Sequence, residues 1–139
     1  MKHPLFASVL CLGLGCSLQT TSWAAESATV TQLLAEYQQA GAAEFSVEAG
    51  KALWEKSFPT ADGKQRSCTA CHHLDLSKAG EHVRTGKTIA AMAPNANSKR
   101  LTKLKKVRKW LKRNCKWTLG RVCNTQEKGD LLVFLSANQ

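Results

Sequence analysis

The chain has few aromatic residues, no internal repeat and no long tract of glycine, proline or serine. Only 6% of its 139 residues are aromatic, although 43% are hydrophobic. This composition excludes collagen-like, coiled-coil and disordered chains, and the length suits one small domain. The core of this domain must therefore be modest, or it must be built around a group that the chain does not encode.

The amino-terminal segment lacks a hydrophobic run long enough for a membrane anchor. Its apolar stretch at residues 5–18 is broken by glycines and is shorter than the roughly 20 residues of a transmembrane helix. Lys2 gives the segment a basic start, and Ser22 and Ala24 provide small residues near a cleavage site. We therefore expect residues 1–24 to be a signal peptide that is cleaved on export to the periplasm of a Gram-negative bacterium, which leaves no membrane segment.

Acidic residues are absent between Glu81 and Glu127. Residues 82–139 carry 14 basic and 2 acidic side chains, whereas residues 25–81 carry 5 and 8, so the formal net charge of +10 belongs to one region. Nucleic acid is not an expected partner of an exported protein. A surface of one sign beside a redox centre instead favours an acidic redox partner, because it steers and accelerates encounter.

Apolar residues recur at helical spacing in four segments, which predicts an all-α chain with long loops. The expected helices cover residues 30–37, 47–58, 99–114 and 126–137. Ser46 and Thr125 are the expected caps of the second and fourth helices, and residues 61–97 show no convincing strand period. We divide the mature chain into an N-terminal helical extension at 25–44 and a cytochrome c domain at 45–139, for the reasons that follow.

The sequence CTACH at residues 68–72 is the pattern of covalent haem attachment. Cys68 and Cys71 can form thioethers with the two vinyl groups of one haem. His72 then lies beneath the iron as the proximal ligand. A covalent haem would also supply the centre that the aromatic-poor core lacks.

Three other interpretations of this cysteine pair compete with haem attachment. A thioredoxin-like redox pair needs a βαβ setting that the chain lacks. A zinc site would have to recruit Cys115 and Cys123, whose separation is larger than in usual zinc knuckles. A disulfide between Cys68 and Cys71 would close a very tight ring. We therefore favour haem c as the cofactor.

The sixth haem ligand decides the function, because a strong ligand makes an electron carrier and a weak or absent one makes a gas-binding or reactive site. The candidates are Met92, His73, His82, Asn114 and several lysines. Met92 is the usual ligand of an electron-transfer cytochrome, but it lies only 20 residues after His72. His73 would have to point away from the iron, and His82 lies in a polar loop.

Asn114 lies on the flank of the apolar stripe of its expected helix, where a polar side chain needs a partner. One interpretation is that it caps the end of this helix. Its neighbour Cys115 can pair with Cys123, and such a disulfide would fix the backbone on which Asn114 stands. The residues alone leave the role of Asn114 open.

The run KWLKRNC at residues 109–115, which continues through Gly120, Arg121 and Cys123, resembles the distal half of the sphaeroides haem protein family of small c-type cytochromes. The CTACH motif and the Met-Ala-Pro sequence at 92–94 fit the same pattern, so the resemblance covers about residues 45–138. It implies a small class I-like cytochrome c fold around one covalent haem. The helix expected at 30–37 lies outside the resemblance.

In that family the sixth ligand is an asparagine beside a disulfide, which corresponds to Asn114 with Cys115 and Cys123. The resemblance implies that this asparagine binds ferric iron, leaves on reduction and admits O2, NO or CO, and that the redox partner is a dihaem c-type cytochrome. We therefore expect a periplasmic monohaem cytochrome that accepts an electron and binds a diatomic gas. The alternatives are an electron-transfer cytochrome with His72 and Met92 as ligands, and a haem enzyme that consumes nitric oxide or peroxide.

Overall fold

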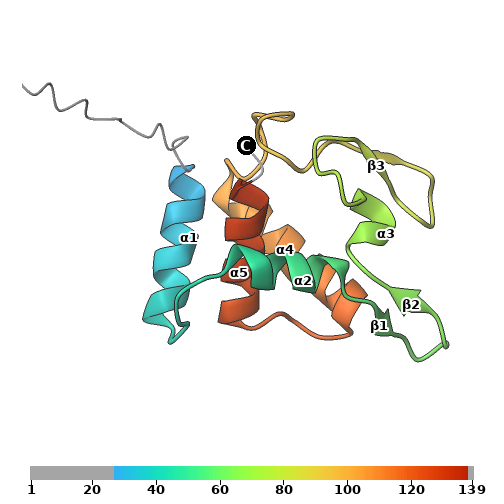
Figure 1. The fold of residues 1–139 in the computed structure, drawn as a ribbon, viewed down its shortest axis with the longest axis horizontal. Helices are drawn as coiled ribbons and strands as arrows, with labels where there is room; N and C mark the ends of the chain where they lie inside the picture. Colours follow the sequence, from blue (N-terminus) through green and yellow to red (C-terminus); the bar gives the residue numbers. More distant parts are fainter. Residues whose placement is uncertain (1–26, 138–139) are drawn as a thin grey trace, which may run out of the picture.

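The computed structural model describes residues 27–137, so the signal peptide expected at 1–24 lies outside the described residues (Figure 1). The described part is mainly helical, as the sequence predicts. Its helices are α1 Ala28–Gln39, α2 Val47–Glu55, α3 Thr69–His72, α4 Leu104–Leu119 and α5 Thr125–Ala137. None of these helices is long and apolar enough to span a membrane.

Two small antiparallel sheets, each of two strands, lie in and just before the region at residues 61–97 where the sequence predicts only loops. Strand β1 (Phe58–Pro59) pairs with β2 (Gln65–Arg66), and β3 (Gly80–Glu81) pairs with β4 (Thr88–Ile89). Strands of two residues are too short to show an alternating pattern. The expectation that the second helix continues to residue 58 is wrong, because a residue that precedes a proline is disfavoured in helical conformation.

Helix α4 differs most from its prediction. It begins at Leu104, five residues later than expected, and it continues past Asn114 to Leu119, where Gly120 ends it with a left-handed φ of 74°. Asn114 therefore lies inside the helix. The interpretation that it caps a helix end is wrong.

Of the two predicted helix caps, the one at Ser46 is confirmed and the one at Thr125 is wrong. Ser46 caps α2, and its hydroxyl accepts a hydrogen bond from the Ala49 N–H at 3.1 Å. The cap of α5 is Asn124 rather than Thr125. The Asn124 side chain accepts from the Glu127 N–H at 2.8 Å, and the Glu127 carboxylate accepts from the Asn124 N–H at 2.9 Å. This reciprocal pair is a capping box.

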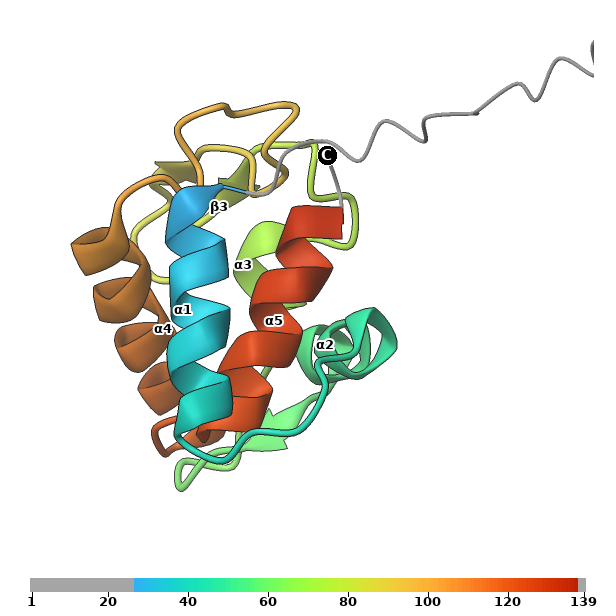
Figure 2. The same cartoon turned by 90° about the vertical axis from the view of Figure 1, so that its left-hand side faces the viewer.

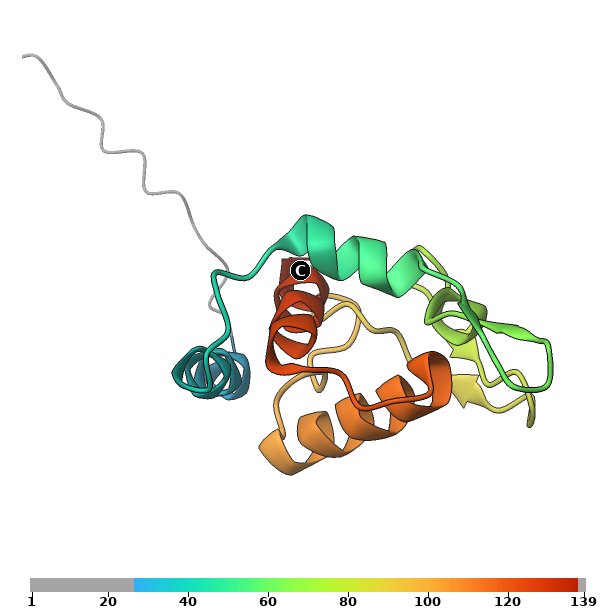
Figure 3. The ribbon, with the colours of Figure 1, turned by 90° about the horizontal axis from the view of Figure 1, so that it is seen from below.

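The helices surround two connected apolar clusters. Helices α2 and α4 lie on opposite sides of the molecule, with α5 between them (Figure 3). Helix α2 approaches α5 so closely that a Cβ atom at Gly50 would lie 2.0 Å from the Asp130 carbonyl oxygen. Helix α1 lies beside α4 and α5 (Figure 2), where Val30 and Leu33 are fully buried. These contacts hold the N-terminal half of α4 in place.

Candidate haem-binding site

A cavity of about 930 Å³ brings the predicted site residues together. Its volume lies within the usual range for cofactor and ligand pockets. It is lined by the five predicted attachment and ligand residues, Cys68, Cys71, His72, Met92 and Asn114. Apolar side chains of α2, α4 and α5 form much of the remaining surface, including Leu53, Trp54, Leu111, Leu131 and Leu135. We call α3 with residues 73–93 the proximal wall of this cavity, and α4 its distal wall.

The geometry of the proximal wall follows from local sequence. Both the Cys71 and His72 N–H groups donate to the Cys68 carbonyl oxygen, at 3.3 and 3.1 Å. Residues three and four positions apart lie on one side of a helical turn, so the spacing of the motif places both thiols and the imidazole together. Strand β3 packs directly against this turn, because a Cβ atom at Gly80 would lie 1.9 Å from the Cys71 carbonyl oxygen.

The electrostatics of the proximal wall favour a neutral His72 imidazole and a neutral Cys68 thiol. Burial, assisted by the nearby Arg100 guanidinium and His73 imidazole, lowers the pKa of His72 to about 4. A histidine must be unprotonated at the nitrogen that binds a metal, so His72 is in the required state. Its buried Nδ1 has no hydrogen-bond partner within residues 27–137. Burial raises the pKa of the Cys68 thiol to about 11.

Trp54 orients the proximal wall, a role that the sequence analysis did not detect. Its ring lies 5.3 Å from the His72 ring, and its Nε1–H donates to the His73 carbonyl oxygen at 3.1 Å. In the sequence Trp54 appears only as part of the apolar stripe of α2. No sequence signal connects it with a histidine 18 positions later.

The distal wall presents Asn114 to the cavity. The Asn114 amide makes no hydrogen bond to any described residue and is exposed to the cavity. Its backbone is held from outside α4, because the Arg66 side chain donates to the Trp117 carbonyl oxygen at 2.9 Å and lies 4.7 Å from the centroid of the Trp117 ring. The amide is thus available to a ligand in the cavity while the helix is fixed.

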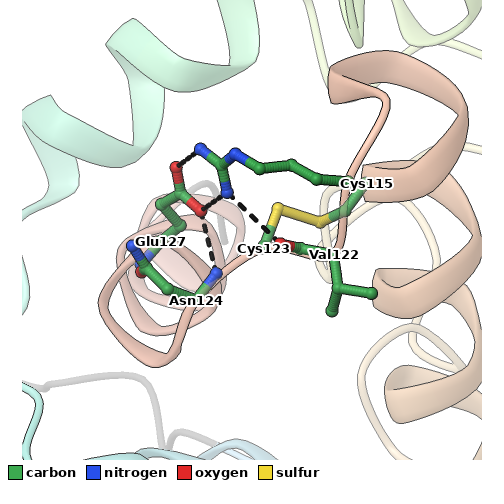
Figure 4. Close-up of polar contacts among 6 residues, drawn as sticks. Cys115, Val122, Cys123, Asn124 and Glu127 are labelled. Carbon is green, nitrogen blue, oxygen red and sulfur yellow. Dashed lines mark hydrogen bonds and ion pairs between the residues drawn. A yellow bond between two sulfur atoms is a disulfide. The ribbon is translucent and has the colours of Figure 1, made fainter.

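The disulfide expected between Cys115 and Cys123 is present, with an S–S distance of 2.03 Å (Figure 4). Both cysteines are buried. The bond connects the residue after Asn114 to the segment that leads into α5. Beside it, the Arg121 guanidinium donates to both carboxylate oxygens of Glu127, at 2.7 and 2.6 Å. Because Cys115 and Cys123 are bonded to each other, they cannot complete a four-cysteine zinc site with Cys68 and Cys71, which are both free thiols.

Met92 also lines the cavity, but it comes from the same wall as His72. The backbone N–H groups of Met92 and Ala93 both donate to the Leu76 carbonyl oxygen at 2.9 Å, and Leu76 follows His72 by four residues. The Met92 side chain packs against the apolar cluster that contains Trp54 and Leu76. This tether favours a packing role for Met92.

The two other histidine candidates differ in position. His82 lines the cavity, and its Nδ1 accepts a hydrogen bond from the Arg84 N–H at 3.3 Å. His73 is exposed and lies outside the lining of this cavity. Neither histidine belongs to the distal wall.

Comparison with known proteins identifies the family. Residues 40–135 match the family model described as "Domain of unknown function (DUF1924)". Cytochrome c-type protein SHP of Cereibacter sphaeroides is 43% identical over 106 residues, which are 76% of this chain and 81% of that relative. The chain belongs to the sphaeroides haem protein family. Cytochrome c'' of Methylophilus methylotrophus is 33% identical over 90 residues, 65% of this chain and 62% of that relative.

Solved structures of both relatives resemble this fold. Oxidised SHP, described as an oxygen binding cytochrome c, superposes with a TM-score of 0.71 and 40% identity, and the match covers 81% of this chain and 99% of that chain. The solution structure of Methylophilus methylotrophus cytochrome c'' gives a TM-score of 0.66 and 29% identity over 76% of this chain and 90% of that chain. Its description refers to the structural basis of haem-ligand detachment. The structural match to SHP covers 81% of this chain, which is more than residues 45–139 contain. The likeness therefore extends into the segment before residue 45, which lay outside the sequence resemblance.

Membership of the sphaeroides haem protein family confirms the predicted fold class and cofactor. The protein is a c-type cytochrome with covalently bound haem c, and its single CTACH motif provides for one haem. The cavity fits this group, since it combines two free thiols, a neutral imidazole and an apolar lining.

Proposed function

We propose that this cytochrome binds a diatomic gas, O2 or NO, at a site that Asn114 closes in the oxidised protein and opens after one-electron reduction. In this proposal Cys68 and Cys71 hold the haem by thioethers, and His72 is the proximal ligand. When bound, the haem supplies an iron that changes oxidation state and accepts axial ligands. One observation carries the assignment: His72 and Asn114 line one cavity from two separate elements, α3 and α4.

The chemistry of an amide suits a removable ligand. The Asn114 oxygen is a neutral, weak and hard donor, which prefers ferric to ferrous iron. Because the amide binds ferric iron more strongly, reduction of the iron shifts the binding equilibrium toward the unbound amide. The disulfide at Cys115 keeps the α4 backbone in place, so the amide can return to the same position on reoxidation. The descriptions of SHP as oxygen binding and of cytochrome c'' in terms of haem-ligand detachment support this assignment.

Anaerobic reduction followed by carbon monoxide tests the proposal. We expect the reduced protein to lose its sixth ligand, to become high-spin and to bind carbon monoxide stoichiometrically. A reduced form that stays low-spin and does not bind the gas would reject Asn114 and favour Met92. As a matched pair, Asn114→Ala should make the oxidised protein high-spin or water-ligated, whereas Met92→Ala should leave its ferric spectrum unchanged.

We further propose that an acidic redox protein delivers the electron across the surface around this cavity. Seven Lys and Arg side chains line the cavity among the described residues, and none of its lining residues is Asp or Glu. Trp110 lies in this lining, remains 49% exposed and lies under the Arg113 guanidinium at 5.1 Å. The partner that the family resemblance implies is a dihaem c-type cytochrome. Its rate of electron transfer to this protein should fall steeply with added salt, and a salt-independent rate would reject this docking surface.

A further inference from the structure

Arg100 differs from the other cations of the cavity. Six lysine and arginine side chains of the lining are exposed, namely Arg84, Lys87, Lys99, Lys103, Lys106 and Arg113. Arg100 is half-buried, and burial lowers its pKa. It forms no ion pair within residues 27–137, and the cavity lining contains no carboxylate. A half-buried charge without a counter-ion is costly, which indicates that the counter-ion comes from a group bound in the cavity.

The hydrogen bonds of Arg100 hold its guanidinium in one orientation. Its Nε–H donates to the Ala91 carbonyl oxygen at 2.6 Å, and its Nη2 donates to the Ala90 carbonyl oxygen. A guanidinium has five N–H donors in one plane, so these two bonds leave the other donors unused. Unused donors in a planar fork match the geometry of a carboxylate.

The backbone around Arg100 is also held in a costly conformation. Leu101 has a φ of 55°, in the left-handed region that favours glycine. Such a conformation persists only where the surroundings enforce it, and it is common at functional sites. Here Ser27 Oγ donates to the Leu101 carbonyl oxygen at 2.8 Å, and Thr29 Oγ1 donates to that of Thr102 at 3.0 Å. The start of α1 thus fixes the segment that carries Arg100.

We propose that Arg100 binds a propionate carboxylate of the haem, and that the start of α1 positions Arg100 for this contact. The propionates are the carboxylates that haem c brings into a cavity whose lining has none. Arg100 then keeps the bound propionate ionised and fixes the orientation of the haem edge. This inference rests on the proposed haem attachment at Cys68 and Cys71, and it is independent of the identity of the sixth ligand.

The midpoint potential of the haem-loaded protein, measured against pH, tests the proposal. A nearby positive charge lowers the pKa of a carboxylate by about 1 to 3 units, so Arg100→Gln should move the propionate step of the potential–pH profile upward by that amount. Above this step the variant's potential should lie below that of the wild type, because one positive charge near the iron is lost. The control is Lys106→Gln, an exposed cation of the same cavity, which should leave the step in place. Identical profiles for the two variants would overturn the proposal.

A second variant covers the case in which Arg100→Gln yields no haem-loaded protein. Arg100→Lys keeps the charge, but an ammonium cannot donate to two carbonyls and a carboxylate in one plane. The step should therefore move in the same direction by a smaller amount, and a step at the wild-type pH would overturn the proposal. Covalent haem content reports separately on the attachment, and carbon monoxide binding to the reduced variants reports separately on Asn114. Neither readout should change if Arg100 acts on the propionate alone.

Discussion

The two walls of the cavity hold their proposed iron ligands by different means. On the proximal wall, one helical turn brings Cys68, Cys71 and His72 together, so sequence spacing alone determines their arrangement. On the distal wall, Asn114 is placed by contacts that reach α4 from other segments. These are the disulfide to Cys123, the Arg66 contact with Trp117, and the packing of α1 against the N-terminal half of α4.

The comparison shows that a fixed backbone can carry either a confined side chain or a mobile one. His72 is confined by Trp54 and by its own helical turn, so it cannot move far without disrupting α3. Asn114 stands on an equally fixed backbone, but its amide has no hydrogen bond to the described chain. In the proposed function, a rotation of this one side chain would remove it from the iron without any opening of the fold. A braced helix with an unpaired amide is therefore suited to a reversible ligand.

The largest effect on haem attachment is expected from a change that breaks the proximal wall. In Gly80→Ala the added Cβ atom would meet the Cys71 carbonyl oxygen at 1.9 Å, and backbone atoms cannot move aside as a flexible side chain can. Overpacking of this kind costs about 1 to 3 kcal/mol and occasionally more. We expect a lower free energy of unfolding, measured with denaturant, and a lower yield of covalent haem. Ala79→Ser, at the exposed neighbouring position, is the control, and equal stability of the two variants would show that β3 does not confine α3.

Loss of the disulfide should affect the distal wall while the proximal wall keeps its haem. The loop between Cys115 and Cys123 spans a separation of 8 residues, for which the chain-entropy model gives roughly 2 to 3 kcal/mol. The double variant Cys115→Ser/Cys123→Ser should lose about this amount of stability and retain covalent haem. Its oxidised form should contain a mixture of low-spin and high-spin haem by electron paramagnetic resonance, because Asn114 is placed less accurately. Complete loss of haem would show that the bridge is needed for folding rather than for placement.

The same difference explains how much could be predicted from the sequence. The attachment motif is a local pattern, and the positions of its three residues were predicted because they depend only on spacing. The end of α4 was missed because the buried residues of its last turns are Cys115 and Thr118, so the aliphatic stripe in the sequence ends at Leu111. The environment of Arg100 could not be predicted, because its partners are carbonyl groups of a loop at residues 90–91 that has no periodic pattern.

The smallest effect is expected at the ion pair beside the disulfide. Hydrogen bonds from Arg121 hold the pKa of Glu127 below its ordinary value of 4.5. A carboxylate with a lowered pKa stabilises the folded state above about pH 4.5, and this contribution is lost as the pH falls through the folded-state value. Since the Arg121 side chain is 55% exposed, we expect less than about 1 kcal/mol.

Glu127→Gln tests this contribution, because glutamine can preserve the capping box with Asn124 but removes the charge and one of the two oxygens that accept from Arg121. The variant should be slightly less stable than the wild type at neutral pH, and the two unfolding curves should converge as the pH falls below about 4.5. The ferric spectrum should stay unchanged throughout, since the disulfide still fixes the backbone beside Asn114. A change of spin state at neutral pH would instead show that the ion pair, and not the disulfide, positions the distal ligand.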